Sequence, residues 1–126
     1  RDFIALVNRI RRENPALQGN DNLDFFPISN EQLIGYAKHT ADLASIIITV
    51  VNLNPHHVQG GWLELPLREM GLDPEQPYQV HDLLGGARFL WYGPRNYVEL
   101  DPKSLPAHIF RVRRRVRTER DFDYYL

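Results

Sequence analysis

The sequence predicts an all-β protein, an antiparallel Greek-key β-sandwich of about eight strands preceded by one N-terminal α-helix. Three observations support this fold class. Segments rich in Ile, Val, Phe and Tyr recur about every ten residues, as in sandwich domains. Turn signals such as Asn54-Pro55 and Gly93-Pro94 separate them. Helical spacing of apolar residues is clear only at the N-terminal end.

Composition is that of one globular domain. The chain has 126 residues, of which 43% are hydrophobic and 25% are charged. It has no cysteine, which excludes disulfides and thiolate metal sites. The longest apolar stretch, residues 43–51, is shorter than the roughly 18 residues that cross a bilayer. We therefore expect a cytoplasmic protein with no membrane partner. Because the chain begins with Arg1 and not Met, we also expect it to be part of a longer polypeptide.

The first predicted element is a helix over residues 2–13. Four apolar side chains follow the i, i+3, i+4, i+7 spacing of a single helix face: Phe3, Leu6, Val7 and Ile10. Asp2 is suited to the N-cap, and Asn14-Pro15 ends the helix because the residue before proline avoids the helical region. A helix of three turns cannot bury its own apolar face. It therefore needs a covering surface, either in the sandwich or in polypeptide that precedes it.

The strands follow in order, at residues 23–28, 32–40, 43–53, 56–65, 78–83, 87–92, 96–100 and 107–116. Gly60-Gly61 predicts a bulge, and residues 66–75 a loop with a helical turn near 67–70. The strand at 43–53 has apolar residues on both faces: Ile46, Ile48 and Val50 on one, Ile47, Val51 and Leu53 on the other. We therefore expect it to be a central strand whose outer side is covered by the helix or by a neighbouring domain.

Basic residues are concentrated near both ends. Residues 1–12 hold four Arg and one Asp, and residues 111–120 hold six Arg and one Glu. In the last strand, Phe110, Val112 and Val116 alternate with Arg111, Arg113, Arg115 and Arg117. This pattern predicts an edge strand with a basic outer row, either solvated or docked on an acidic partner. No nucleic acid is expected, because the middle of the chain is acidic. The aromatic residues of 118–126 predict a tail that docks back.

Motifs of catalysis are not found in the sequence. It has no phosphate-binding loop, no GxSxG, no HExxH and no metal-ligand spacing, so we expect no catalytic residue, no metal and no cofactor here. His56 and His57 are adjacent and are expected at the surface. Asp82 is expected to be partly buried as an acceptor for backbone or Arg donors.

Four aromatic residues are candidates for carbohydrate contact: Trp62, Trp91, Tyr92 and Tyr97. Flat rings stack on the faces of sugars, and small β-sandwiches can present them on a strand. Burial in the core or at a domain interface is the simpler interpretation, because such rings bury a large apolar area.

Several segments together resemble one known family. The opening RDFIALVNRIRRENPALQ resembles the last helix of the catalytic barrel of α-amylase-type enzymes. The segments IIITVVNLNPHHVQGGWLELPL, YQVHDLLGGARFLWYGPRNYVELDP and PAHIFRVRRRVRTERDFDYYL resemble the bacterial α-1,4-glucan:maltose-1-phosphate maltosyltransferases, members of the α-amylase superfamily. The resemblance covers essentially the whole chain. It is specific over residues 52–66 and 78–110, whereas the helix alone indicates only an α-amylase-like enzyme.

The resemblance implies a function for the parent polypeptide. Family members transfer a maltosyl unit from α-maltose 1-phosphate to α-1,4-glucan with retention, using an Asp nucleophile and a Glu acid/base. Those carboxylates lie on an N-terminal (β/α)₈ barrel, and no residue of this chain corresponds to them. Residues 1–18 would be the end of the last barrel helix with its linker, and residues 19–126 the C-terminal β-sandwich. The expected partner is that barrel, in a homodimeric parent enzyme, and the domain alone is expected to be inactive.

Three functions remain open at this point. The domain could stabilise the barrel, act as a carbohydrate-binding module that holds the α-1,4-glucan acceptor, or serve as an independent interaction module through its Arg-rich end. The sequence favours the first, because it offers no paired carboxylates and leaves the helix face without a cover.

Overall fold

The computed structural model describes residues 2–19, 22–117 and 123–125, with side chains described for residues 3–19 and 22–114. Helix α1 (Asp2–Glu13) leads into the short 3₁₀ helix η1 (Pro15–Leu17). The strands are β1 (Leu23–Phe26), β2 (Leu33–His39), β3 (Ile46–Asn52), β4 (Gln59–Glu64), β5 (Tyr78–Asp82), β6 (Arg88–Trp91), β7 (Arg95–Leu100), β8 (Ala107–Arg117) and β9 (Asp123–Tyr125).

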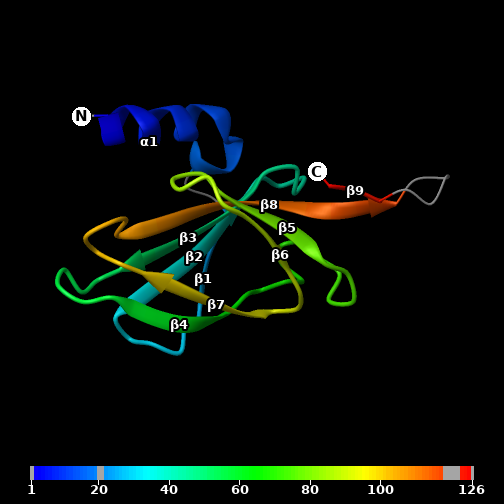
Figure 1. The fold of residues 1–126 in the computed structure, drawn as a ribbon. Helices are drawn as coiled ribbons and strands as arrows, with labels where there is room; N and C mark the ends of the chain where they lie inside the picture. The colour runs from blue at the N-terminus through cyan, green and yellow to red at the C-terminus, as the bar shows by residue number, and fades with distance from the viewer. Residues whose placement is uncertain (1, 20–21, 118–122, 126) are drawn as a thin grey trace.

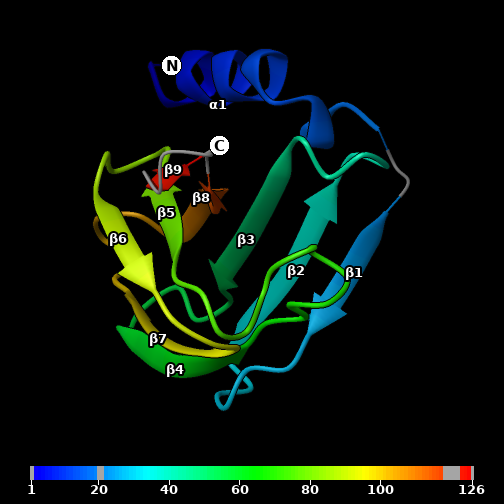
Figure 2. The same cartoon turned by 90° about the vertical axis from the view of Figure 1, so that its right-hand side faces the viewer.

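The strands form two antiparallel sheets. The larger has the order β1-β2-β3-β8-β5-β6, with β9 paired to β8, and the smaller pairs β4 with β7. Helix α1 lies above the larger sheet, whereas β4 and β7 lie at the opposite side of the molecule (Figures 1 and 2). The predicted β-sandwich with one N-terminal helix is therefore confirmed, and each predicted strand has a counterpart.

The core fills the space between the two sheets. The larger sheet contributes Ile48, Val80 and Phe110, which are at most 1% exposed, and the smaller contributes Leu63 and Leu100. Residues 67–71, predicted as a helical turn, form hydrogen-bonded turns that bury Met70 completely. Burial of this apolar surface is the main force that holds the sheets together.

Strand β3 is central and buried on both faces, as predicted. Ile46, Ile48 and Val50 point into the core, whereas Ile47 and Thr49 point to the other side and are also buried. We call that other side of the larger sheet its outer face. Helices α1 and η1 cover it over β3, because Ile10 and Ala16 are buried and the Ala16 N–H donates to Ser45 Oγ at 3.2 Å. The predicted cover is thus provided within the chain at this point.

Buried polar side chains tie the sheets together. Asn52 Nδ2, at the end of β3, donates to the carbonyl of Leu100 in β7 at 3.1 Å. The hydroxyl of Tyr78 in β5 donates to the Gly93 carbonyl at 2.6 Å, and Asn96 Nδ2 in β7 donates to the same hydroxyl at 3.0 Å. Burial raises the pKa of Tyr78, so its phenol stays neutral and keeps its donor role. These contacts fix the position of β7, which carries part of the candidate site.

Two sequence expectations are corrected. Strand β8 is not an edge strand, because it pairs with β3 on one side and β5 on the other. Alternation of apolar and charged residues reports one buried face, and it does not distinguish a central strand from an edge. Leu53, expected on a covered face of the 43–53 strand, lies beyond the end of β3 and is 58% exposed.

The C-terminal tail was expected to dock back on the domain. Backbone pairing of β9 with β8 joins Tyr125 to Arg115 and Asp123 to Arg117. The expected burial of the tail's rings lies outside the described residues, as do residues 118–122 and 126.

We predict that Ile47→Ala and Ile48→Ala each lower the free energy of unfolding by about 2–5 kcal/mol, because each side chain is 0% exposed on a different face of β3. Chemical denaturation of the 126-residue chain measures this loss. Leu53→Ala is the control, with a change below about 1 kcal/mol. Losses below about 1 kcal/mol at both isoleucines would contradict the central placement of β3.

Candidate functional site

The apolar face predicted for α1 is only partly covered. Ile10 is 3% exposed, Leu6 and Val7 are half-buried, and Phe3 is 48% exposed. Ile4, which lies off the predicted face, is 63% exposed. A hollow of about 240 Å³ separates part of α1 from the sheet and is lined by Val7 and Ile10 on the helix side. The helix thus packs through its C-terminal half and leaves apolar side chains of its N-terminal half in solvent.

Exposed apolar side chains continue on the outer face beside the helix. Phe26 and Ala37 point into the core, so their neighbours Phe25 and Tyr36 point outward, with ring centroids 5.8 Å apart. Phe25 is 64% exposed, Leu23 40% and Ile34 38%. A patch of this kind is typical of a surface that meets another protein. The patch could not be predicted from the sequence, because two short strands do not indicate which of their faces points outward.

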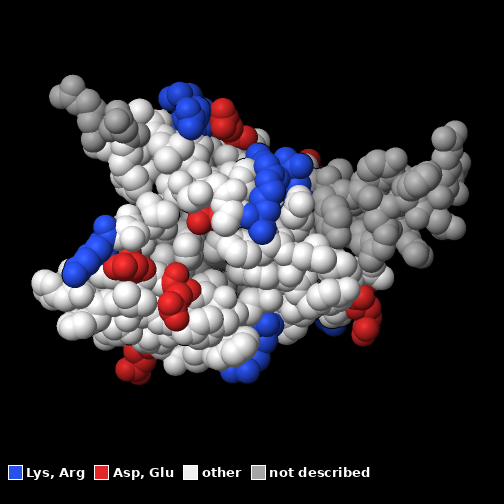
Figure 3. Space-filling view, in the orientation of Figure 1, with Lys and Arg blue, Asp and Glu red and all other residues white. Residues whose placement is uncertain are grey.

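A basic row lies on the outer face of β8, β5 and β6. It consists of Arg111 and Arg113 of β8, His81 of β5, which pairs with Arg111, and Arg88 of β6, which pairs with His81. Arg111 Nη2 donates to His81 Nδ1 at 3.2 Å. Figure 3 shows basic side chains grouped over the region of β5 and β8.

Within the described residues, the basic row is only partly compensated by acidic groups. Burial lowers the pKa of His81, and the charges of Arg88, Arg111 and Arg113 lower it further. Burial also lowers the pKa of Arg111, again with help from Arg113 and Arg88, although Glu13 opposes the shift. Among the described residues, Arg111 Nε is buried without a hydrogen-bond partner, and none of the three arginines forms a salt bridge. Such a row favours contact with carboxylates.

The aromatic candidates separate into different places. Trp62 in β4 and Tyr97 in β7 are cross-strand partners, 42% and 49% exposed, with ring centroids 5.3 Å apart. Trp91 packs against the core, 5.3 Å from the ring of Phe110, and Tyr92 is 61% exposed beyond β6. Trp91 is therefore packed against the core and Trp62 is not, whereas packing of Trp62 at a domain interface stays a prediction.

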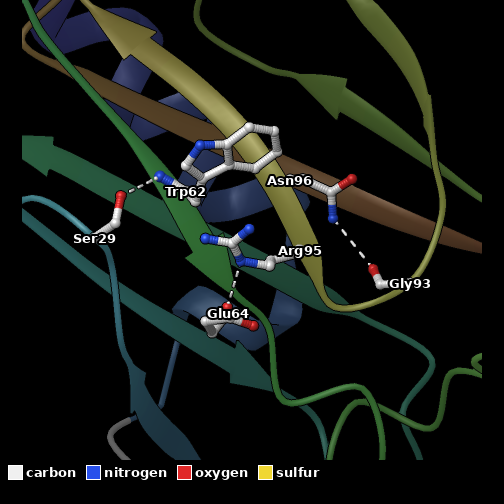
Figure 4. Close-up of polar contacts among 6 residues, drawn as sticks. All are labelled: Ser29, Trp62, Glu64, Gly93, Arg95 and Asn96. Atoms are coloured by element: carbon white, nitrogen blue, oxygen red, sulfur yellow. Dashed lines mark hydrogen bonds and ion pairs between the residues drawn. The ribbon is translucent and has the colours of Figure 1, made fainter.

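Charged side chains surround the Trp62–Tyr97 pair. Arg95 Nε donates to Glu64 Oε1 at 2.8 Å, and the Arg95 guanidinium lies 5.0 Å from the centroid of the Trp62 ring (Figure 4). Tyr97 Oη donates to Glu99 Oε2 at 3.2 Å. Glu64 and Arg95 were not identified from the sequence. Once β4 and β7 are paired, the two residues lie directly opposite each other.

Asp82 is buried and 4% exposed and accepts a backbone donor, as expected, and its other donor is a histidine and not an arginine. Its carboxylate accepts the Leu84 N–H at 3.1 Å and His108 Nδ1 at 3.2 Å. Burial alone would raise the pKa of Asp82, but the hydrogen bond and charge of His108, together with backbone donors, bring it below its usual value. The residue closes the β5–β6 turn and is a structural group.

Within the described residues, no group of three His, Asp or Glu residues could hold a metal ion, and no helix is long and apolar enough to cross a membrane. His56 and His57 lie exposed in the loop between β3 and β4.

Solved structures identify the class of fold. An α-amylase from Anoxybacillus superposes with a TM-score of 0.61 over 88% of this chain and 22% of its own, at 17% sequence identity. A putative α-N-acetylgalactosaminidase from Bacillus halodurans matches with a TM-score of 0.51 over 71% of this chain and 19% of its own, at 13% identity. The chain therefore has the β-sandwich fold found in part of α-amylase-type proteins.

Sequence comparison then gives the family. The family model described as "GLGE, C-terminal" matches residues 25–112, and the chain belongs to this family. Proteins named α-1,4-glucan:maltose-1-phosphate maltosyltransferase are 48% identical in Chlorobaculum tepidum, 51% in Rhodospirillum rubrum and 42% in Myxococcus xanthus. These matches cover 89%, 89% and 99% of this chain, but only 18%, 16% and 19% of those proteins.

We predict that Asp82→Asn weakens the fold at neutral pH by about 1–3 kcal/mol, because it removes a buried charge that His108 and backbone donors stabilise. A lowered carboxyl pKa stabilises the fold above the unfolded-state pKa, and this stabilisation is lost as the pH falls through the folded-state value. The difference between wild type and variant should therefore shrink as the pH falls below about 5 and passes through the folded-state pKa, which lies below 3.8.

Denaturation of both proteins across this pH range measures the effect. Asp73→Asn is the control, since Asp73 also accepts a backbone N–H but is exposed. A difference that stays constant with pH would contradict the role assigned to the Asp82 carboxylate.

Proposed function

We propose that this chain is the non-catalytic C-terminal β-sandwich domain of a maltosyltransferase that extends α-1,4-glucan from α-maltose 1-phosphate, and that it stabilises the catalytic barrel of that enzyme. Family membership and the names of the relatives support the assignment. In this proposal residues 1–18 are the end of the last barrel helix with its linker, and residues 19–126 are the domain. The enzyme is cytoplasmic and homodimeric.

The observation that carries the stabilising role is the incomplete cover of the outer face. Ile4 and Phe3 on α1, and Phe25 on β1, are between 48% and 64% exposed, and they lie on the helix and the sheet face that the helix covers. Large exposed apolar side chains that cluster in this way are uncommon on isolated domains and favour a protein partner. If α1 is the last helix of the barrel, the rest of the barrel lies next to this face and can cover it.

The basic row favours an acidic surface on the partner. Burial, with the charges of Arg113 and Arg88 on the same face, lowers the pKa of Arg111, so a carboxylate-bearing surface would stabilise its charged form. We therefore propose that the barrel surface facing β8 and β5 is acidic. This also accounts for the Arg-rich end without a separate interaction partner.

We predict that Ile4→Asp lowers the melting temperature of the full-length enzyme by about 5 °C or more, because it places a charge in an apolar contact. The same change should leave the 126-residue chain nearly unaffected, since Ile4 is 63% exposed there. Differential scanning calorimetry of both proteins makes the comparison. Val58→Asp is the matched control, because Val58 is 51% exposed in the loop before β4. Equal losses in the two proteins would argue against an interdomain role for α1.

We also predict that the purified 126-residue chain releases no phosphate from α-maltose 1-phosphate in the presence of glucan, because the proposed catalytic carboxylates belong to the barrel. A phosphate assay against a buffer control, with the full-length enzyme as positive control, tests this. Turnover by the isolated chain would require a catalytic site within it and would overturn the proposal.

A further inference from the structure

We propose that Trp62, Tyr97 and Arg95 form a binding surface for α-1,4-glucan on the outer side of the β4–β7 sheet. This surface is separate from the barrel-facing side, because α1 and the β4–β7 sheet lie on opposite sides of the molecule (Figures 1 and 2). The identity of the saccharide rests on the proposed function. The presence of a binding surface rests on the geometry of the three side chains and their neighbours.

The two rings are exposed although the fold holds their strands rigidly. The backbone N–H of Trp62 donates to Ser29 Oγ at 2.8 Å, and the backbone N–H of Ser29 donates to the Trp62 carbonyl at 3.0 Å. The other edge of β4 pairs with β7, so both edges of the strand are bonded at Trp62 (Figure 4). On the inner side, Leu63 and Val98 anchor the two strands in the core. The rings therefore need little ordering on binding, which favours affinity.

Gly60 leaves room for the position of the Tyr97 ring. A Cβ atom at Gly60 would lie 2.0 Å from Tyr97 Oη, so any other residue would displace the phenol. With glycine there, the phenol lies across β4 and its hydroxyl donates to Glu99. A phenol used only for hydrophobic burial would not be 49% exposed in this way.

The polar neighbours favour a neutral, hydroxyl-rich ligand. Arg95 uses Nε for Glu64, and among the described residues its two terminal nitrogens have no hydrogen-bond partner. Glu64 and Glu99 supply carboxylate acceptors, and together with Arg95 they make the surface slightly acidic, which disfavours anionic polymers. A second copy of the chain is the alternative occupant, because Trp, Tyr and Arg are also enriched in protein–protein interfaces, and sedimentation distinguishes the two.

The angle between the rings selects among neutral saccharides. The rings of Trp62 and Tyr97 meet edge to face at 63°, and the Arg95 guanidinium lies over the Trp62 ring at 5.0 Å from its centroid. The parts of the two rings that remain exposed are therefore turned relative to each other. Successive glucose rings of an α-1,4-linked chain also turn relative to one another, whereas a β-1,4-linked chain is flat and is suited to coplanar rings. Rings that are not coplanar suit an α-1,4-linked chain better than a flat, cellulose-like chain.

Isothermal titration calorimetry of the 126-residue chain with maltoheptaose tests the inference directly. We expect saturable binding that Trp62→Ala or Tyr97→Ala weakens by about tenfold or more, since each removes a stacking ring. Tyr92→Ala is the matched control, an aromatic residue elsewhere that is even more exposed, at 61%, and should bind as the wild type does. Circular dichroism and the melting temperature of each variant verify that it is folded.

Three results would overturn the inference: no saturable binding of maltoheptaose, unchanged binding by both ring variants, or equal binding of cellohexaose. Concentration-dependent dimerisation abolished by Trp62→Ala, measured by sedimentation, would assign the surface to a second copy instead. None of these results bears on barrel stabilisation, which the Ile4→Asp comparison tests separately.

Discussion

The two-sided burial of β3 is the constraint on which the rest of this structure depends. An antiparallel sheet usually keeps one face in water, but Ile47 and Ile48 on opposite faces of β3 are both fully buried. The inner face is covered by β4, β7 and their connecting loops, and the outer face by α1 and η1. Without the helix, the most apolar strand of the chain would expose one side. The position of α1 is therefore part of the fold.

This constraint divides the surface of the domain into two sides with different roles. The side that carries α1 has exposed apolar residues such as Ile4 and Phe25 and the basic row, which together fit a protein partner. The opposite side carries Trp62 and Tyr97 on a firmly bonded two-stranded sheet, surrounded by charges, which fits a hydrated ligand. A domain attached through one side keeps the other available, so stabilisation of a barrel and contact with glucan are compatible.

The sequence predicted the positions of the strands better than it predicted which strands pair with each other. Period-two alternation located the strands, and the apolar residues on both sides of 43–53 correctly placed β3 in the centre. The same alternation misplaced β8 at an edge, because pairing of β3 with β8 joins residues about sixty positions apart and leaves no local signal. The exposure of Trp62 in the chain could not be predicted for a similar reason: which face of β4 is exposed depends on its pairing with β7 and on the Ser29 segment. The grouping of Arg88, Arg111 and Arg113 into the basic row also depends on strand order, because it requires β5 to lie between β6 and β8.

The most direct test of the central claim is hydroxyl-radical footprinting of side chains in the isolated chain and in the full-length enzyme. If the α1 side faces the barrel, labelling of Phe3 and Phe25, which are 48% and 64% exposed in the chain, should fall severalfold in the full-length enzyme. Labelling of Trp62 and Tyr97 should stay the same. The reverse pattern, with Trp62 and Tyr97 protected and Phe3 and Phe25 still labelled, would contradict the account.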